Sequence, residues 1–175
     1  ALLLVLAGCS ADQSDLGSNA KASQSTTKTE SAKATNSSQD SMSKMTIYVP
    51  LDNGKGVTPK LVTVDSNKKT VAYAITFLLD EDSRQSYPTF PKGTKVNGVN
   101  IKDHTAYIDL SKEFLDNSQL DGLTAQLRLA SLVNTATEFD GVDNVQFLVN
   151  GKSIDLYGGY DLSVPMKRME KQIVK

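Results

Sequence analysis

The stretch VNGVNIKDHTAYIDL, residues 96–110, decides the fold of this chain. Apolar residues recur along both halves, and in the second half Ala106, Ile108 and Leu110 alternate strictly with polar residues, which is the period of a strand that buries one face. Asp103 and His104 separate the two halves and are residue types that favour turns. The stretch therefore predicts a β-hairpin, with one strand at 96–101 and the other at 105–110.

A helix is predicted on each side of this hairpin along the chain. The earlier one is expected over residues 68–79, where Asp65-Ser66-Asn67 offers capping side chains and the apolar residues recur at helical spacing. The later one is expected from Leu120 to Phe139, and Gly141 ends it.

Three further strands are predicted, at residues 45–49, 61–64 and 145–149. The element order is then strand, strand, helix, strand, strand, helix, strand. We expect one α+β domain, a two-layer sandwich in which two helices cover one face of a mixed β-sheet.

Two segments of the expected domain show no period. Residues 80–93, which begin Asp80-Glu81-Asp82, are predicted to be a solvated loop, and residues 152–175 have no clear element. Three successive acids point in different directions, whereas calcium needs about six to eight oxygen ligands around one point. We therefore predict no metal site there.

The first residues have the pattern of an export signal. The apolar run at residues 2–6 is too short to span a bilayer, and it ends in Ala7-Gly8 before Cys9. Leu6-Ala7-Gly8-Cys9 resembles the bacterial lipobox, in which the chain is cut before a cysteine that carries acyl chains such as palmitate. We expect residues 1–8 to be the end of a lipoprotein signal peptide and Cys9 to be the lipidated residue.

A polar tether is expected after Cys9. Residues 10–43 are rich in Ser, Thr, Ala, Asn, Asp and Lys, and they cannot bury enough apolar surface to offset the entropy of ordering. A flexible coil of this length spans roughly 30 Å on average and extends to about 110 Å. The predicted organisation is a signal remnant (1–8), the lipidated cysteine with its tether (9–43) and a folded domain (44–175).

Composition excludes several classes of function. Lys and Arg number 19 against 20 for Asp and Glu, which gives no electrostatic footprint of a nucleic-acid binder. With one Cys and one His, the chain can form no internal disulfide and lacks the usual metal ligands, so no cofactor is expected. His104 lies in a predicted turn without a nucleophile signature beside it, so no catalytic residue is predicted.

Five segments together resemble the GerMN domain, in that family's order and spacing. They are Phe90–Val96, Ala106–Phe114, Leu132–Phe139, Gly141–Phe147 and Asn150–Lys152. The resemblance extends from Thr46 to about Pro165. It implies an extracytoplasmic module first described in sporulation and spore germination proteins, often found on lipoproteins and similar in fold to the ring-building domains of envelope assemblies.

The chain departs from that family's pattern in two ways. Members known for sporulation tend to carry two such domains, whereas this chain has one and resembles the lone-domain lipoproteins of Gram-positive bacteria. Asp80-Glu81-Asp82 also replaces a small turn that follows the first helix in the family, often Gly-Pro. The loop after these acids is longer than usual, and there we expect the chain to differ from its relatives.

Three functions remain open from the sequence. The first is a noncatalytic binding or assembly module at the outer face of the cytoplasmic membrane, which contacts an envelope protein or a second copy of itself. The second is a peptidoglycan-binding module, and the third is a cell-wall enzyme. Glycines let a backbone approach a partner and aromatic rings offer apolar faces. The candidate contact residues are Tyr87, Phe90, Tyr157, Gly158, Gly159 and Tyr160.

Overall fold

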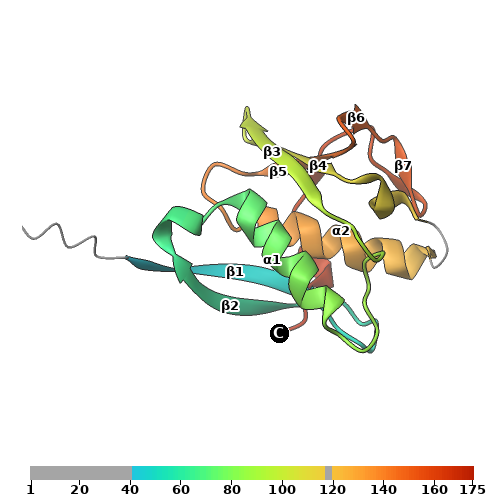
Figure 1. Cartoon of the computed structure of the whole chain (residues 1–175). Helices are drawn as coiled ribbons and strands as arrows, with labels where there is room; N and C mark the ends of the chain where they lie inside the picture. Colours follow the sequence, from blue (N-terminus) through green and yellow to red (C-terminus); the bar gives the residue numbers. More distant parts are fainter. Residues whose placement is uncertain (1–40, 117–119) are drawn as a thin grey trace, which may run out of the picture. The chain divides into compact units, whose positions relative to one another are not determined.

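The computed structural model describes residues 41–116 and 120–175 (Figure 1). Cys9 and almost all of the predicted tether lie outside these residues, so their assignments stay predictions. The longer elements are β1 (Met42–Pro50), β2 (Val57–Asp65), α1 (Val71–Ser83), β3 (Val96–Lys102), β4 (Thr105–Leu110), α2 (Gly122–Ala136) and β5 (Asn144–Val149). The shorter ones are β6 (Lys152–Ser153), β7 (Leu156–Tyr157), β8 (Tyr160–Asp161), β9 (Met166–Lys167) and the 3-10 turns Ser66–Lys68, Lys112–Leu115 and Glu170–Gln172.

The main sheet is mixed, as predicted. β3 pairs antiparallel with β4, and β4 pairs parallel with β5. β5 also pairs antiparallel with β6 and with β9. β1 and β2 pair with each other and form a separate antiparallel ribbon. Figure 1 shows α1 and α2 between this ribbon and the main sheet, and both helices contact both sheets. The α+β class is therefore confirmed, with the first two strands forming a sheet of their own.

The core follows from the alternation of apolar residues in the strands. Every second residue of β4 and of β5 is buried against the helices, while Tyr107 and Asp109 lie on the opposite, half-exposed face. The turn between β3 and β4 has positive φ at both Asp103 (49°) and His104 (59°), the backbone that a two-residue hairpin requires. The predicted hairpin is therefore correct in its strands and in its turn, and its register shifts at an irregularity between Val96 and Gly98.

The first helix was predicted with the wrong ends. Asp65 makes no capping hydrogen bond, and Thr70 instead accepts one from the Tyr73 amide, so α1 starts at Val71. At its other end α1 continues through Asp80–Asp82 to Ser83. The prediction that these acids form a solvated loop is wrong, because they make the last turn of the helix.

Residues 166–174, called here the 166–174 strap, fold back across α2. The Asn134 side chain accepts a hydrogen bond from the Met169 amide (2.7 Å) and donates one to its carbonyl (3.2 Å). The Arg168 guanidinium lies 5.0 Å from the centre of the Tyr48 ring. Ile173 bridges to Val57 at the start of β2. The strap thus joins α2 to the ribbon in a segment where the sequence shows no element.

Candidate functional site

A groove lies between α1 and the loop of residues 84–95 that follows it. Its main hollow has a volume of about 500 Å³, and a second hollow of about 310 Å³ shares four of its lining residues. We call the two together the α1 groove. Volumes of about 300–1,000 Å³ are usual for ligand sites. The helix side is lined by Thr76, Leu79, Asp80, Asp82 and Ser83, and the loop side by Pro88, Phe90, Pro91, Lys92, Gly93, Thr94 and Lys95, with Val96 at the start of β3.

The buried carboxylate of Asp82 fixes one side of the loop. Asp82 is 2% exposed, and its Oδ1 and Oδ2 accept hydrogen bonds from the amides of Thr89 (3.0 Å) and Phe90 (2.9 Å). A buried carboxylate keeps its charge only where donors and opposite charge compensate for lost water. Here two backbone amides are the donors. The last turn of α1 is therefore hydrogen-bonded to the backbone of Thr89 and Phe90, seven and eight residues further along the chain.

Arg128 of α2 fixes the other side of the same loop. It is 2% exposed, and its Nε donates to the Thr89 carbonyl at 2.7 Å. Its Nη1 donates to the Tyr157 hydroxyl at 2.7 Å, and that hydroxyl donates to the Phe114 carbonyl at 3.2 Å. The Tyr157 and Phe114 rings stack with centroids 4.4 Å apart. The peptide groups of Thr89 therefore form hydrogen bonds with side chains of both helices, and these bonds fix the position of the loop side of the groove.

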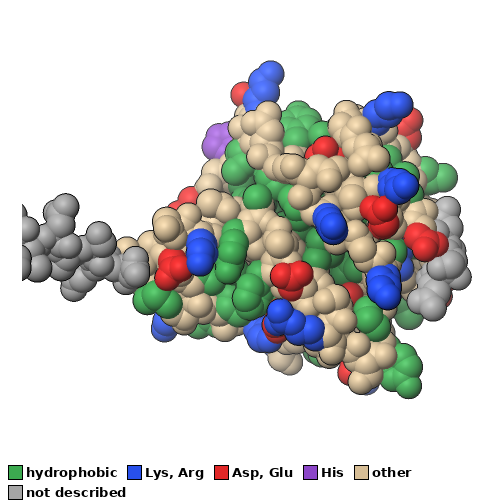
Figure 2. All heavy atoms as spheres, viewed as in Figure 1, with side chains coloured by type: hydrophobic (Ala, Val, Ile, Leu, Met, Phe, Trp, Pro, Cys, Tyr) green, Lys and Arg blue, Asp and Glu red, His purple; other side chains and the backbone are tan. Residues whose placement is uncertain are grey.

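Charges of opposite sign stand on the two sides of the groove. Asp80 is exposed on the helix side, and Lys92 and Lys95 are exposed on the loop side. Within the described residues, ion pairs form next to the groove, between Glu81 and both Lys60 and Arg84, but none joins Asp80 to either lysine. Figure 2 shows acidic and basic side chains interspersed on this face. The groove can therefore offer both signs of charge to a ligand.

Burial raises the pKa of the Asp82 carboxyl above its ordinary value of 3.8, and the hydrogen bonds from Phe90 and Thr89 and the charge of Arg128 oppose this rise. The folded chain thus keeps the Asp82 proton to a higher pH than the unfolded chain does. As pH rises from about 3.8 through the folded pKa, deprotonation of Asp82 lowers the free energy of unfolding.

We expect the free energy of unfolding of the native chain, minus that of Asp82→Asn, to fall as pH rises over that range. Urea denaturation at a series of pH values between about 3 and 8 measures this difference. Asp161→Asn is a control of opposite sign, because the Ser163 hydroxyl lowers the pKa of Asp161 and its contribution grows with pH. A flat difference for Asp82 would contradict the assignment.

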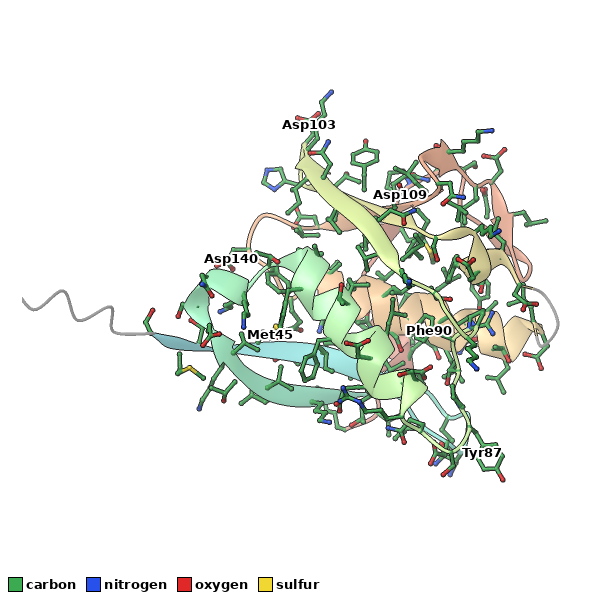
Figure 3. The ribbon with its side chains drawn as sticks, viewed as in Figure 1. Met45, Tyr87, Phe90, Asp103, Asp109 and Asp140 are labelled. Carbon is green, nitrogen blue, oxygen red and sulfur yellow. The ribbon has the colours of Figure 1, made fainter. Side chains whose placement is uncertain are left out.

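The structure separates the six predicted contact residues. Tyr87 is 82% exposed, whereas Phe90 is 6% exposed and belongs to the core. Figure 3 shows Tyr87 at the outer tip of the loop and Phe90 nearer the body of the domain. Tyr157 is 2% exposed, so burial removes Phe90 and Tyr157 from any flat contact surface, although Phe90 is among the residues that line the groove.

The remaining three contact residues lie around the β7–β8 hairpin. Tyr160 is half-buried and its hydroxyl donates to the Gln126 side chain at 3.0 Å. Gly158 and Gly159 both have positive φ, and Gly158 packs directly against Ala125 of α2. These glycines are explained by the tight turn and by packing, and the structure does not bring them to the α1 groove.

Other candidates for chemistry are accounted for by their surroundings. His104 is exposed, with Nδ1 3.6 Å from an Asp143 carboxylate oxygen. Among the described residues, no group of three or more His, Cys, Asp or Glu side chains is placed to hold a metal ion. In the same residues, no helix is both long and apolar enough to cross a membrane.

The residues that build the groove are not apparent from local sequence patterns. The pattern places Asp82 in a solvated loop and does not single out Arg128. One signal was available, because Arg128 interrupts an otherwise apolar stretch between Leu127 and Leu129. The longer loop was expected to be the point of difference, and the groove forms there.

The family model described as sporulation and spore germination, Germane, matches residues 46–155. The first GerMN domain of the sporulation protein GerM from Bacillus subtilis is 25% identical, with a TM-score of 0.60 over 72% of this chain and 98% of that one. The tandem GerMN domains of GerM are 23% identical, with a TM-score of 0.59 over 74% of this chain and 48% of that one, so this chain spans about half their length.

A protein from Clostridium perfringens described as a candidate lipoprotein is 26% identical, with a TM-score of 0.51 over 74% of this chain and 89% of that one. No curated protein matches the chain. The sequence resemblance, the family model and the shared fold agree with one another. Because the family model covers more than half of the 175 residues, this chain belongs to the Germane family of sporulation and spore germination domains.

Proposed function

We propose that this chain is a lipid-anchored, noncatalytic binding module of the bacterial cell envelope, which docks its partner in the α1 groove. Cys9 carries the lipid and holds the domain at the outer face of the cytoplasmic membrane. The apolar run that ends in Ala7-Gly8-Cys9 supports this anchor, and so does the likeness to a Clostridium protein described as a candidate lipoprotein. One acyl chain anchors a protein only marginally, so stable attachment needs the several chains expected on such a cysteine.

The observation that carries the proposal is the way the groove is built. Its loop side is fixed by the buried Asp82 and Arg128, while Asp80, Lys92 and Lys95 stay exposed on its sides. A preorganised surface binds with a smaller loss of conformational entropy than a mobile one. Fixed walls with uncommitted charges are therefore suited to recognition.

The same groove offers poor means for acid–base catalysis. Its lining includes neither histidine nor cysteine, and both oxygens of its buried carboxylate accept backbone hydrogen bonds. General acid–base catalysis needs a positioned group that is free to exchange a proton with the substrate. A cell-wall enzyme is the weaker alternative, and it predicts that Asp80→Asn alone abolishes function.

Crosslinking in intact cells tests the proposal. A photoreactive amino acid at Ser83, on the helix side of the groove, is expected to form adducts with an envelope component. The same group at Asn100, exposed on β3 and outside the groove lining, is the matched control and is expected to form none. In a Cys9→Ala strain, the chain should be shed into the medium or stay unprocessed, and the adducts should disappear.

Two results would count against the proposal. Adducts from Asn100 but not from Ser83 would place the docking surface elsewhere. A Cys9→Ala chain that is processed normally and stays in the membrane fraction would remove the lipid anchor. Digestion of the adducts with a cell-wall hydrolase separates wall material from a protein partner.

A further inference from the structure

The exposed charges of the α1 groove call for a ligand that carries both signs. Asp80 stands on one side, with Lys92 and Lys95 on the other. The Ser111 side chain lowers the pKa of the Glu113 carboxyl most, and the charges of Lys112 and Lys95 add to this, but no described ion pair joins Lys95 to Glu113. A simple anion would meet the lysines and be repelled by Asp80. A neutral sugar could hydrogen-bond to these groups but would leave their charges unpaired.

The apolar lining and the volume of the groove favour a small peptide as its ligand. Leu79 and Phe90 line it together with Pro88 and Pro91, so its surface is mainly apolar between the charged sides. Its volume of about 500 Å³ suits a few small residues. An extended peptide that alternates methyl side chains with charged groups would place its methyls on this floor and its charges against the sides. Peptides of this kind crosslink bacterial cell walls.

We infer that the α1 groove binds the short stem peptide of peptidoglycan, with a peptide carboxylate against Lys92 and Lys95 and the side-chain amine of its diamino acid against Asp80. This rests on the proposed function, because only a chain displayed outside the membrane meets this ligand. The inference names the occupant of the same groove.

Weak binding is expected from this geometry. The charges lie at the solvent-exposed rim, where one ion pair adds at most about fivefold to affinity. A cell wall presents many copies of the peptide, and an anchored domain meets them at high local concentration. Weak single contacts are therefore enough to hold or orient the domain on the wall.

Calorimetric titration of the full chain, purified in detergent, with a purified disaccharide-tetrapeptide tests the inference. Lys95→Glu turns an attraction into a repulsion, so we expect affinity to fall about tenfold. Lys102→Glu makes the same charge change at the end of β3, outside the groove lining, and should leave affinity unchanged. Circular dichroism checks that both variants stay folded.

Altered ligands identify which charge meets which side. When the peptide carboxylates are amidated, Lys95→Glu should cause no further loss, because their partner is already gone. When the peptide amine is acetylated, Asp80→Lys should likewise lose its effect. This double-mutant logic isolates each pair from general changes in the protein.

Several outcomes would overturn the inference. They are the absence of binding at millimolar ligand, equal binding of a glycan strand without peptides, and equal losses from Lys95→Glu and Lys102→Glu. If the peptide does not bind while Ser83 crosslinks to an envelope protein, the inference fails and the proposed function stands. If Ser83 also forms no adduct, both fail.

Discussion

Replacing Arg128 by Ala is expected to lower the free energy of unfolding by about 3–4 kcal/mol. The change leaves the part-buried Thr89 carbonyl and the buried Tyr157 hydroxyl without their 2.7 Å donor. Each buried polar group left unsatisfied costs about 1–3 kcal/mol, and the missing side chain leaves a cavity as well. Asp82 also loses the nearby positive charge that lowers its pKa, so its pKa should rise further.

Urea denaturation followed by circular dichroism measures this loss. Arg84→Ala is the matched control, since Arg84 is exposed and pairs with Glu81 at the surface, and its loss should stay below about 0.5 kcal/mol. A loss below about 1 kcal/mol for Arg128→Ala would mean that the loop is not held as described. Such a result would also weaken the proposal of a preorganised groove.

Gly158→Ala is expected to destabilise the domain by about 3 kcal/mol. A Cβ at this position would lie 2.2 Å from the Ala125 side chain, and φ is +53° there, where L residues are strained. Overpacking costs about 1–3 kcal/mol and a left-handed alanine about 1–2 kcal/mol. Neither the turn nor α2 can relax freely, because Tyr157 on one side is buried and hydrogen-bonded.

Gly159→Ala provides the control for backbone strain alone. Its φ is +89°, but an added Cβ meets no atom within 4 Å, so about 1 kcal/mol is expected. Thermal denaturation of the two variants side by side gives the difference. Equal losses would show that packing against Ala125 is unimportant, and would reopen Gly158 as a contact residue.

The hairpin at 96–110 could be predicted because its information is local. Ala106, Ile108 and Leu110 alternate with polar residues, and Asp103-His104 tolerates positive φ. Each feature acts within a few residues along the chain. The α+β order of elements follows from the same kind of pattern. The second helix was predicted too long, because it was expected from Leu120 to Phe139 and α2 spans Gly122–Ala136.

The end of α1 could not be predicted from such patterns. Three successive acids usually lie in solvent, and the exposed Asp80 fits that expectation. Asp82 is buried because amides from the next loop and a guanidinium from α2 come to it in space. Nothing in the neighbouring residues encodes those partners. The candidate site was missed for the same reason, although the loop that forms it was identified as unusual.

The different burial of two tyrosines could not be predicted from the sequence. Tyr157 and Tyr160 flank the same pair of glycines, yet the first is buried on Phe114 and the second is half-exposed beside Gln126. The short strands after residue 152 escape prediction too, because each has two residues and depends on pairing with distant segments. Periodicity requires more residues than these strands contain.

The 166–174 strap affects the order in which the parts of the domain fold. Its Met169 and Ile173 complete an apolar cluster with Leu127 and with Tyr48 and Val57, and the last two lie more than a hundred residues earlier in the chain. Contacts between residues so far apart in sequence form late in folding. The ribbon and α2 therefore do not reach their final packing until Met169 and Ile173 are in place. The domain therefore reaches its final packing only after residue 173 has been synthesised.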